Sequence, residues 1–409
     1  MTGVEVSPVE WVRGSLDQCV KCTICESACP VMEVTGLFLG PKTVGPQAER
    51  FRTGGHSPDH SVDYCSGCGI CTRVCPQGVR IAEINSRAKA QLRVEHGGRL
   101  RDQLIARPEV MGRLARPVAP LFNWAMSNQL LRAVGQRMVG IHRLAPVPRA
   151  TTRTLQYRLQ RRRPRRPTTR RVVYFHGCST NYFEPRVGLA TIAVLEHNGF
   201  QVEVPRQGCC GLPLQSNGLY PAARDYIRRL TSQLSKPDLA GLDVIATSTS
   251  CGLMVKREAI EILGVEDRSL EDLASRTYDI FEFLRARHDA GELRTDFVEV
   301  PLTVAYHAPC QQQNQQIGKP VLDILSLVPG LKLVELDRGC CGIAGTYGTK
   351  VEKYDIAMRV GAPLFGDISE VQPDLVLCDS ETCRWQISHG TGVASVHPVE
   401  ILYKAYGGR

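Results

Sequence analysis

The sequence contains no run of the roughly 20 apolar residues that a helix needs to cross a bilayer. It also shows no secretory signal, because the opening MTGVEVSPVEWVRG has neither a basic start nor an apolar run. From these two absences we expect a cytoplasmic protein. Cysteine side chains remain thiols in that reducing compartment.

A nucleotide-binding fingerprint is also absent, since no G-x-G-x-x-G follows a predicted strand. The glycines of GCCGIAGTYG (339–348) alternate with cysteines in a different spacing. We therefore expect neither a nicotinamide nor a flavin cofactor in this chain. Oxidation of a substrate then has to be done by a partner protein.

Acidic residues are missing from one stretch of the chain. Ten arginines occur between Arg149 and Arg171 without any aspartate or glutamate, and they account for the formal net charge of +9. No recognisable nucleic-acid-binding module accompanies them, so we expect no nucleic-acid partner.

Cysteine, in contrast, is abundant, with 17 in 409 residues. In a reducing compartment this number indicates metal ligation rather than disulfides. Eight cysteines form two strings of the type C-x2-C-x2-C-x3-C-P, which are CVKCTICESACP (19–30) and CSGCGICTRVCP (65–76). In two-cluster ferredoxins the last cysteine of each string binds the other cluster. The strings thus predict two [4Fe–4S] clusters, one held by Cys19, Cys22, Cys25 and Cys75, the other by Cys65, Cys68, Cys71 and Cys29.

A pair of structural zinc sites is the alternative reading of these strings. Zinc normally binds two C-x2-C knuckles, or cysteines mixed with histidine, rather than four cysteines in a run that ends in proline. The doubled string therefore favours iron.

Eight further cysteines belong to an internal repeat. The segments YFHGC, QGCCGLP and STSCGLM recur as YHAPC, RGCCGIAG and SETCRWQ, at an offset of 131 or 132 residues. A constant offset indicates a duplicated domain of about 130 residues. The candidate ligands are Cys178, Cys209, Cys210 and Cys251 in the first copy, and Cys310, Cys340, Cys341 and Cys383 in the second.

Each copy alternates short apolar runs with segments of helical periodicity, which predicts two small α/β domains with parallel sheets. Ligand residues then lie where strands end, as is usual for open α/β sheets. Predicted helices include 187–196 and 321–327. The predicted strands are 172–175, 202–204 and 244–246 in the first copy, and 304–306, 333–336 and 375–377 in the second.

Glycines on both sides of each Cys-Cys pair permit the sharp turn that points adjacent thiolates at one target. A buried structural pair or a redox-active disulfide is the alternative to a metal site. Neither alternative explains why the outer cysteines recur in step with the pair. We therefore expect a metal or iron–sulfur site in at least one copy.

Taken together, the chain resembles the C subunit of anaerobic glycerol-3-phosphate dehydrogenase. Relatives of that family include the iron–sulfur subunits of glycolate and lactate oxidation and the B-type subunit of heterodisulfide reductase. Beyond the cysteines, the resemblance rests on GPKTVGPQAERFR (40–52), GCCGIAGTYG (339–348), SETCRWQI (380–387) and VHPVEIL (396–402). It implies that a flavin subunit oxidises the substrate while this chain passes electrons to the membrane quinone pool.

The heterodisulfide reductase relatives imply a full site of the form C…CC…C-x2-C, which holds a non-cubane [4Fe–4S] cluster. This chain departs from that form, because Ser248 and Ser380 replace the first cysteine of the C-x2-C pair. Serine is a poor ligand for iron, so disulfide chemistry is in doubt. The second copy adds Cys378, where the first has Ala246; it either replaces the missing ligand or is a buried strand residue, which we favour.

Residues 104–145 are amphipathic and precede the arginine cluster RRRPRRPTTRR (161–171). An apolar helical face beside dense positive charge suits an anchor on anionic lipid, and Trp124 suits its interface. Equally, these helices could pack between domains with the arginines solvated. The face is expected to comprise Leu121, Phe122, Ala125, Met126, Leu130, Val134 and Met138, with Arg132 and Arg137 elsewhere.

Three histidines lie near these motifs. His176 and His307 precede the first cysteine of each copy, although their spacing is one residue off the repeat. We favour a hydrogen-bonding role beside the metal site over direct ligation, with a simple loop role also open. His397 before Pro398 is interpreted as structural.

The predicted fold class is α+β and multidomain. Residues 1–100 form a helical two-cluster ferredoxin domain, 101–170 an amphipathic and arginine-rich linker, and 171–295 and 296–409 the two Cys-Cys-Gly domains. We expect two [4Fe–4S] clusters, with one or two further iron–sulfur or zinc sites in these domains. The expected partners are a flavoprotein subunit, quinone and the inner face of the cell membrane.

The predicted function is an electron-transfer subunit of a flavin dehydrogenase of the glycerol-3-phosphate type. Glycolate or lactate oxidation is one alternative. A thiol or heterodisulfide reductase acting at the Cys-Cys-Gly sites, and a non-catalytic scaffold, are the others.

Overall fold

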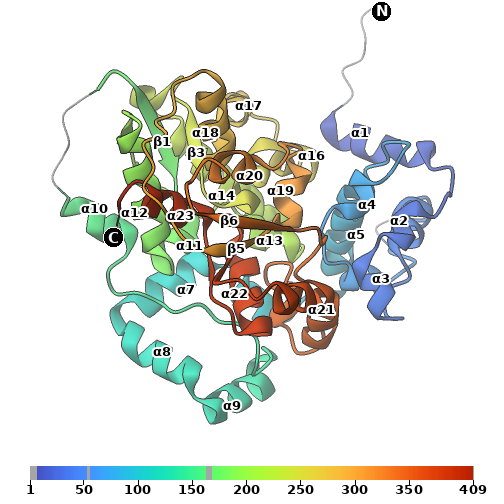
Figure 1. The fold of residues 1–409 in the computed structure, drawn as a ribbon. Helices are drawn as coiled ribbons and strands as arrows, with labels where there is room; N and C mark the ends of the chain where they lie inside the picture. Colours follow the sequence, from blue (N-terminus) through green and yellow to red (C-terminus); the bar gives the residue numbers. More distant parts are fainter. Residues whose placement is uncertain (1–6, 53–55, 163–167, 409) are drawn as a thin grey trace, which may run out of the picture.

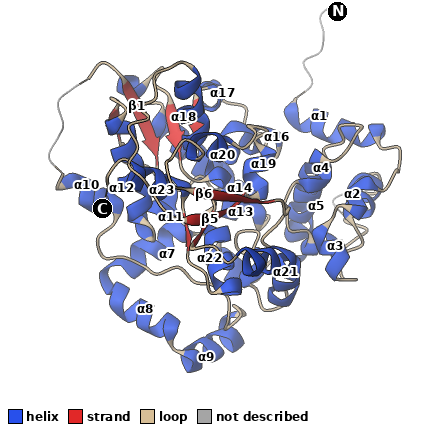
Figure 2. Ribbon diagram, in the orientation of Figure 1, coloured by secondary structure: helices blue, strands red, loops and turns tan. Residues whose placement is uncertain are grey.

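The computed structural model describes residues 7–52, 56–162 and 168–408. Most of the chain is helical, and the strands are confined to two small sheets (Figures 1 and 2). The N-terminal residues form a separate lobe of helices, to the right of the sheets in Figure 1.

The N-terminal lobe consists mostly of short helices, because tight cysteine loops that each end in proline interrupt the chain. The exception is α5, which buries Ile81, Ile84 and Ala88 on one face. The elements are α1 (Pro8–Gly14), η1 (Ser15–Gln18), α2 (Ile24–Ser27), α3 (Pro30–Val34), η2 (Thr43–Gln47), η3 (Ser61–Tyr64), α4 (Ile70–Arg73) and α5 (Ile81–His96), where η marks short turns of 3₁₀- or π-helix.

The linker that follows is also helical. Its predicted amphipathic face is divided between two helices, since Asn128 ends one and caps the next by accepting hydrogen bonds from the N–H groups of Leu130 and Leu131. No helix within the described residues is long and apolar enough to cross a membrane. The elements are α6 (Leu100–Ile105), α7 (Pro108–Ala115), η4 (Arg116–Val118), α8 (Ala119–Ser127), α9 (Gln129–Val139) and α10 (Leu155–Gln160).

Part of the arginine cluster lies outside the described residues, namely 163–167. The remaining arginines of the cluster flank this gap, at the end of α10 and before the first strand.

The first copy of the repeat contains a four-stranded parallel sheet in the order β2-β1-β3-β4. The strands are β1 (Arg171–Phe175), β2 (Gln201–Glu203), β3 (Val244–Ala246) and β4 (Thr277–Asp279). The helices are α11 (Gly177–Tyr182), α12 (Pro185–His197), α13 (Leu212–Ser216), α14 (Tyr220–Leu234), η5 (Pro237–Leu239), α15 (Thr249–Leu253), η6 (Met254–Glu258), α16 (Ala259–Glu261), α17 (Arg268–Ser275) and α18 (Ile280–Asp289).

The second copy repeats this topology, with the parallel order β6-β5-β7-β8. Its strands are β5 (Thr303–His307), β6 (Lys332–Leu336), β7 (Leu375–Leu377) and β8 (Ser395–Val396). Its helices are α19 (Cys310–Asn314), α20 (Pro320–Leu325), η7 (Tyr347–Thr349), α21 (Tyr354–Val371), α22 (Glu381–Thr391) and α23 (Pro398–Ala405).

All six predicted strands lie where the structure has strands, within a residue or two at each end. The fourth strand of each sheet was not predicted, because β4 and β8 are only three and two residues long and contain polar side chains. Such short segments carry no readable periodicity.

The two copies share one hydrophobic core. The first long helix of each copy packs against the last helix of the other, since α12 contacts α23 and α18 contacts α20. Val187 and Phe281 of the first copy and Val321 and Val399 of the second belong to the same buried cluster. This reciprocal packing brings the carboxyl ends of both sheets, and therefore the cysteines that follow them, toward the linker and the N-terminal lobe.

Candidate iron–sulfur centres and the cavity between them

The first cysteine loop joins η1 to α2 and lies near the surface. Cys22 is exposed, whereas Cys25 is buried. The neighbours that act on the Cys25 thiol include Cys19 and Cys75, and burial raises its pKa to about 11. The structure thus brings the last cysteine of the second string to the first loop, in the predicted crossed arrangement.

The second cysteine loop is more deeply enclosed. A small cavity is lined by Cys29, Cys65, Cys68 and Cys71, the four residues of the second predicted group. Burial raises the pKa of Cys29 to about 11 and that of Cys71 well above its usual range. Thiolates are the form that binds metal, and a buried thiolate is costly without a nearby positive centre. Four converging sulfurs in an enclosed site fit an iron–sulfur cluster.

The two loops have the same backbone shape but different residues. Lys21 and Thr23 in the first loop, with φ of 61° and 67°, adopt the left-handed region that Gly67 and Gly69 adopt in the second, with φ of 70° and 78°. Side chains in this region cost about 1–2 kcal/mol each. A Cβ on Gly69 would lie only 2.0 Å from Asn314 Nδ2, so close packing against α19 requires glycine there.

The first copy holds its four cysteines at the carboxyl ends of β1, β2 and β3. Cys178 Sγ lies 3.8 Å from Cys209 Sγ, and Cys210 Sγ lies 3.3 Å from Cys251 Sγ. Ser248 caps α15 with its hydroxyl, which accepts a hydrogen bond from the Cys251 N–H at 3.4 Å. This serine therefore has a local backbone role, consistent with its being a poor ligand.

The second copy brings its cysteines together in the same way. Cys310 lies beside Cys340, and Cys341 lies beside Cys383. Cys378 directly follows β7, has no exposed surface and packs in the core next to Cys383. It is not among the residues that line the large cavity described below.

The glycine after each Cys-Cys pair is sterically required. Gly211 and Gly342 have φ of 87° and 88°. A Cβ would lie 2.9 Å from Ala223 O in the first copy and 1.9 Å from Ala357 O in the second. The turn that presents both thiols therefore depends on a helix that passes directly behind it.

The three histidines have different surroundings. His176 Nδ1 lies 2.6 Å from Gly177 O, and burial lowers its pKa to about 4. His307, at the end of β5, is fully buried beside Cys383, and neither of its ring nitrogens has a hydrogen-bond partner among the described residues. His397 caps α23 and lies 2.9 Å from Thr247 O of the first copy. The strands align His307 with Phe175, which explains the one-residue mismatch.

The second cysteine loop lies against the second copy. Burial raises the pKa of the Cys68 thiol, and Cys340 adds to the rise. The Asn314 side chain donates a hydrogen bond to Cys68 O at 3.0 Å, and Arg73 donates to the same side chain at 3.4 Å. The second cysteine loop is therefore hydrogen-bonded to the second copy, and thiols of both line one cavity.

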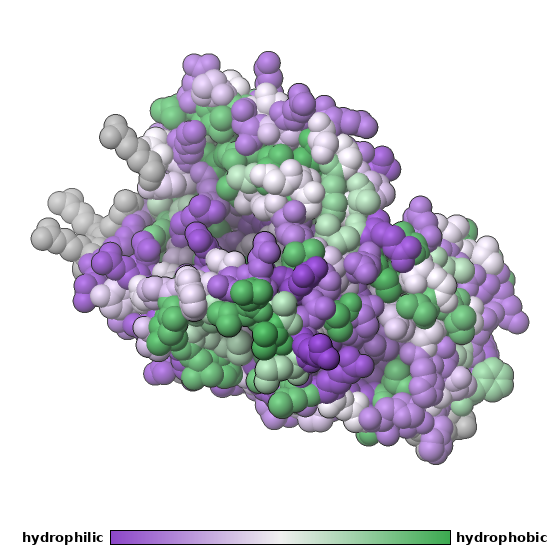
Figure 3. All heavy atoms as spheres, turned by 90° about the horizontal axis from the view of Figure 1, so that it is seen from below, coloured by the Kyte–Doolittle hydropathy of each residue, from purple (hydrophilic) through white to green (hydrophobic). Residues whose placement is uncertain are grey.

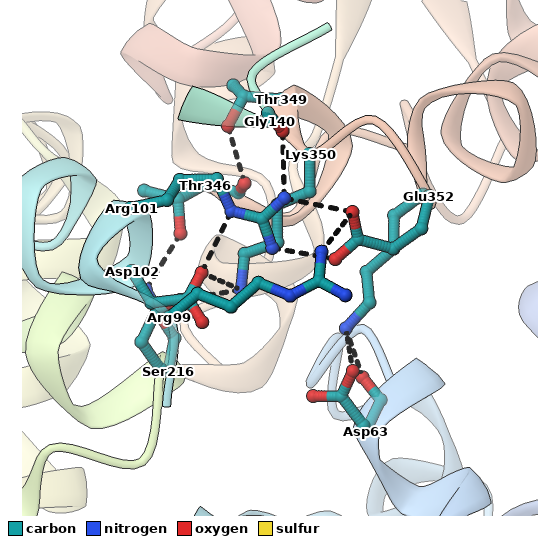
Figure 4. A network of polar contacts seen from close by, with 12 residues as sticks. Asp63, Arg99, Arg101, Asp102, Gly140, Ser216, Thr346, Thr349, Lys350 and Glu352 are labelled. Atoms are coloured by element: carbon teal, nitrogen blue, oxygen red, sulfur yellow. Dashed lines mark hydrogen bonds and ion pairs between the residues drawn. The ribbon is translucent and has the colours of Figure 1, made fainter. Parts of the chain in front are cut away.

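A network of buried charges joins the lobe, the linker and the second copy (Figure 4). Arg101 forms two hydrogen bonds with Glu352, at 2.9 and 2.6 Å, and Lys350 pairs with Asp102 at 3.0 Å. Lys353, which is almost fully buried, pairs with Asp63 at 2.5 Å. Sequence reasoning missed these residues, because charged side chains paired across some 250 positions leave no local pattern.

One cavity of about 560 Å³ connects the sites. Its wall contains ten cysteines, among them Cys65 and Cys68 of the second loop and all eight of the repeat. Within the described residues, no three histidine, cysteine or carboxylate side chains are arranged around a single metal ion.

Comparisons with known families agree with the cysteine pattern. A model of the 4Fe-4S dicluster domain matches residues 15–79, and a model of the cysteine-rich domain matches twice, at 172–256 and 304–388.

Relatives that match over nearly the whole chain are also found. The chain is 35% identical to the C subunit of anaerobic glycerol-3-phosphate dehydrogenase from Escherichia coli (strain K12), over 96% of this chain and 98% of that protein. It is 25% identical to the D subunit of dihydromethanophenazine:CoB–CoM heterodisulfide reductase from Methanosarcina barkeri, over 92% of this chain and 89% of that protein. It is 24% identical to the glycolate oxidase iron-sulfur subunit of Escherichia coli (strain K12), over 95% of this chain and 94% of that protein.

Proposed function

The chain belongs to the family of anaerobic glycerol-3-phosphate dehydrogenase C subunits, and from this membership we propose that it carries electrons from a flavoprotein to quinone. It binds iron–sulfur clusters, as its dicluster and cysteine-rich domains indicate. The observation that carries the proposal is that Cys65 and Cys68 of the lobe line the same cavity as all eight cysteines of the repeat. This shared cavity places the thiol groups of the lobe and of the repeat next to one space.

The proposed ligand groups are the sixteen cysteines of the two strings and the two copies. Clusters bound there supply one-electron carriers. The chain's own contribution is their order: the first loop lies near the surface, the second loop is enclosed, and the second copy opens on the cavity. Electron entry at the first loop and exit at the cavity follow from this order.

We propose that the flavoprotein docks over the first loop. The exposed thiol of Cys22 marks where a redox group reaches the surface. Large apolar side chains are exposed around it, and such patches mark protein interfaces. They are Val20, Ile24, Leu37, Leu39 and Phe51.

Helices α8 and α9 are the proposed contact with the membrane. Figure 3 views the molecule from their side and shows hydrophobic residues gathered there. No acidic residue occurs between Glu109 and Glu184, so the same segment is strongly basic and suits anionic lipid. The exposed large apolar side chains of the two helices are Leu121, Trp124, Leu130, Leu131, Val134, Met138 and Val139.

The substrate of the flavoprotein is proposed only from the names of the relatives. Glycerol 3-phosphate is named by the relative at 35% identity, whereas glycolate is named by the relative at 24%. Supplying glycerol 3-phosphate, glycolate and lactate separately to the assembled complex distinguishes these substrates.

The test uses the full chain, prepared without oxygen together with its flavoprotein. Glycerol 3-phosphate is expected to reduce a short-chain naphthoquinone, and Cys68→Ser is expected to lower this rate at least about 100-fold. A dye that accepts electrons from the flavin itself serves as the control, and its reduction should survive the substitution. Undiminished quinone reduction by the variant, or a preparation without acid-labile sulfide, contradicts the proposal.

A thiol or disulfide reductase is the second candidate. The close approach of Cys210 and Cys251, at 3.3 Å, and the relative named as a heterodisulfide reductase favour it. Disulfide turnover by the purified chain with an artificial electron donor would support this activity.

A further inference from the structure

The large cavity has two walls that iron and sulfide do not need. Its volume of about 560 Å³ includes the space of the clusters proposed at its cysteines, so the room for an organic ligand lies against the other walls. Its thiols account for only one side. The remaining surface comes from the linker helices and from the junction of α5 with α13 and η6.

The first of these walls is apolar. Side chains from α7, α8, α9 and the following turn line it, namely Met111, Phe122, Met126, Leu131, Val139 and Ile141. Helices α8 and α9 therefore present apolar residues on two faces, one toward the cavity and one toward the outside. An apolar ligand could extend from the cavity along these helices.

The second wall is polar and incompletely satisfied. Asn85 is fully buried, and neither atom of its amide has a hydrogen-bond partner among the described residues. Gln215 Oε1 and Glu258 Oε2 are likewise buried and unpaired within the described part of the chain. An unpaired buried polar atom costs about 1–3 kcal/mol. One unpaired donor, Asn85 Nδ2, beside unpaired acceptor oxygens on the same cavity wall indicates a ligand whose oxygens can both accept and, as hydroxyls, donate hydrogen bonds.

We propose that this cavity binds a lipophilic quinone, with a carbonyl oxygen accepting from Asn85 Nδ2, the O–H groups of the reduced ring facing Gln215 Oε1 and Glu258 Oε2, and its tail along α8 and α9. The inference rests on the proposed function and assigns the binding site of its electron acceptor, the quinone, to this cavity. A p-quinone combines two carbonyl groups with an apolar tail, which matches the two walls. The ring then lies in a cavity that thiols of the second copy also line.

The reaction at this site is the reduction of a quinone to a hydroquinone. The ring gains two electrons, which originate from the substrate that the flavoprotein oxidises, and two protons from water, so that two C=O groups become two C–OH groups. Burial raises the pKa of Glu258 to about 7, and the nearby Glu83 adds to the rise. Arg257 and a hydrogen bond from Gln215 oppose it. Near neutral pH this carboxyl can hold and pass a proton.

A larger side chain at Gly135 is suited to block the cavity. It lies in α9 and lines the cavity, and a Cβ added there meets no atom within 4 Å beyond its own helical turn. Gly135→Phe therefore starts from a Cβ that meets no neighbour, places its ring at the cavity, and removes a helix-weakening glycine. Gly366 in α21 is the matched control, because it is equally unobstructed but does not line the cavity.

The experiment measures binding of a short-chain naphthoquinone to the full iron-loaded chain by equilibrium dialysis. Gly135→Phe is expected to weaken binding at least 10-fold and to slow quinone reduction by the complex. Iron and sulfide content and reduction of the centres by glycerol 3-phosphate should stay unchanged. Gly366→Phe should behave as the unmodified chain, and Gln215→Leu should weaken binding without loss of iron.

Unchanged binding in Gly135→Phe, or equal loss in Gly366→Phe, overturns the inference. Displacement of the naphthoquinone by a low-molecular-weight disulfide also overturns it, since the cavity would then serve thiol chemistry. If the centres are reduced by substrate but binding resists Gly135→Phe, the inference alone fails. If the unmodified complex shows no substrate-driven reduction, the proposed function fails, and the binding titration still decides whether the cavity takes a quinone.

Discussion

The two copies of the repeat share a framework but differ in what surrounds it. In each copy, a buried tyrosine of the first strand is hydrogen-bonded to a residue just after the third strand. Tyr174 OH lies 2.8 Å from Thr247 Oγ1, after β3, and Tyr306 OH donates to Asp379 Oδ2 at 2.8 Å, after β7. The four cysteines follow in register. The duplicated scaffold therefore sets where the thiols lie.

Their neighbours differ. In the first copy, the Cys209 N–H donates to Glu109 of the linker at 2.9 Å, and Glu109 is in turn paired with Arg229. In the second copy, Asn314 donates a hydrogen bond to Cys68 O of the second cysteine loop. The difference teaches that one scaffold can be given two sets of neighbours, and in the proposed electron path it puts the second copy nearer the donor.

The largest expected effect comes from breaking this difference with matched substitutions. Cys340→Ser should lower substrate-driven reduction of quinone at least about 100-fold, because it removes a proposed cluster ligand from the copy that is hydrogen-bonded to the second cysteine loop. Cys209→Ser, at the equivalent position, should leave reduction of the second-copy centre intact. Paramagnetic resonance of the complex after addition of glycerol 3-phosphate measures this. Equal loss in both variants would show that the copies are not ordered along the path.

A smaller effect is expected at the strand ends. His307 is buried with unpaired ring nitrogens beside Cys383 among the described residues, whereas the first copy has Phe175 at that place. A histidine there can hydrogen-bond to the sulfur of a bound cluster, and such outer contacts are worth about 10-fold in retention. His307→Phe should therefore release iron from the second copy about 10-fold faster under a chelator.

The reciprocal change Phe175→His provides the comparison, because it places the same ring at the equivalent site. Iron release from the first copy should then slow or stay as it is. Retention in His307→Phe equal to that of the unmodified chain would leave the histidine as a packing residue only.

The smallest expected effect concerns the interface between the copies. Asp279 caps α18, and His397 caps α23 at the equivalent position. Burial raises the pKa of Asp279 to about 8, with Asp379 of the other copy adding to the rise and Lys256 opposing it. Because the folded state holds this proton more tightly than the unfolded state, stability should fall as pH rises from about 4 to about 8.

Asp279→Asn keeps the cap and removes the buried charge. Between pH 6 and 8.5 its unfolding midpoint should fall less than that of the unmodified chain, by roughly 2 °C or more. Asp267→Asn, which changes a cap at the start of α17, is the control and should not alter the pH dependence. Parallel curves for all three proteins would mean that Asp279 does not carry the effect.

Much of the fold was predictable from local patterns. The strands around Val173 and Val304 were predicted from short apolar runs, and the structure has them within a residue or two. The break at Asn128 was missed, although an asparagine followed by helical periodicity is a known helix start. The surroundings of the amphipathic face could not be predicted, since Phe122 lines a cavity while Leu121 beside it is exposed.

The cysteine sites likewise divide into features that local sequence predicts and features that depend on tertiary packing. Their membership could be proposed from spacing, because thiols three residues apart on a tight loop must converge. The role of Ser248 as a helix cap could also be guessed from its position before Cys251. The unpaired amide of Asn85, buried among the described residues, could not, since an asparagine within α5 looks like any helical polar residue.

The sequence by itself determined the two cysteine strings, the duplicated parallel sheets and the family, because each depends on short-range spacing. Only the tertiary structure decided that Asn314 of the second copy bonds to Cys68 O, that both copies open on one cavity, and that linker helices form its apolar wall. The physical reason is that contacts between distant segments depend on how whole helices and sheets pack, through buried surfaces such as those joining α12 to α23. No local pattern encodes that packing.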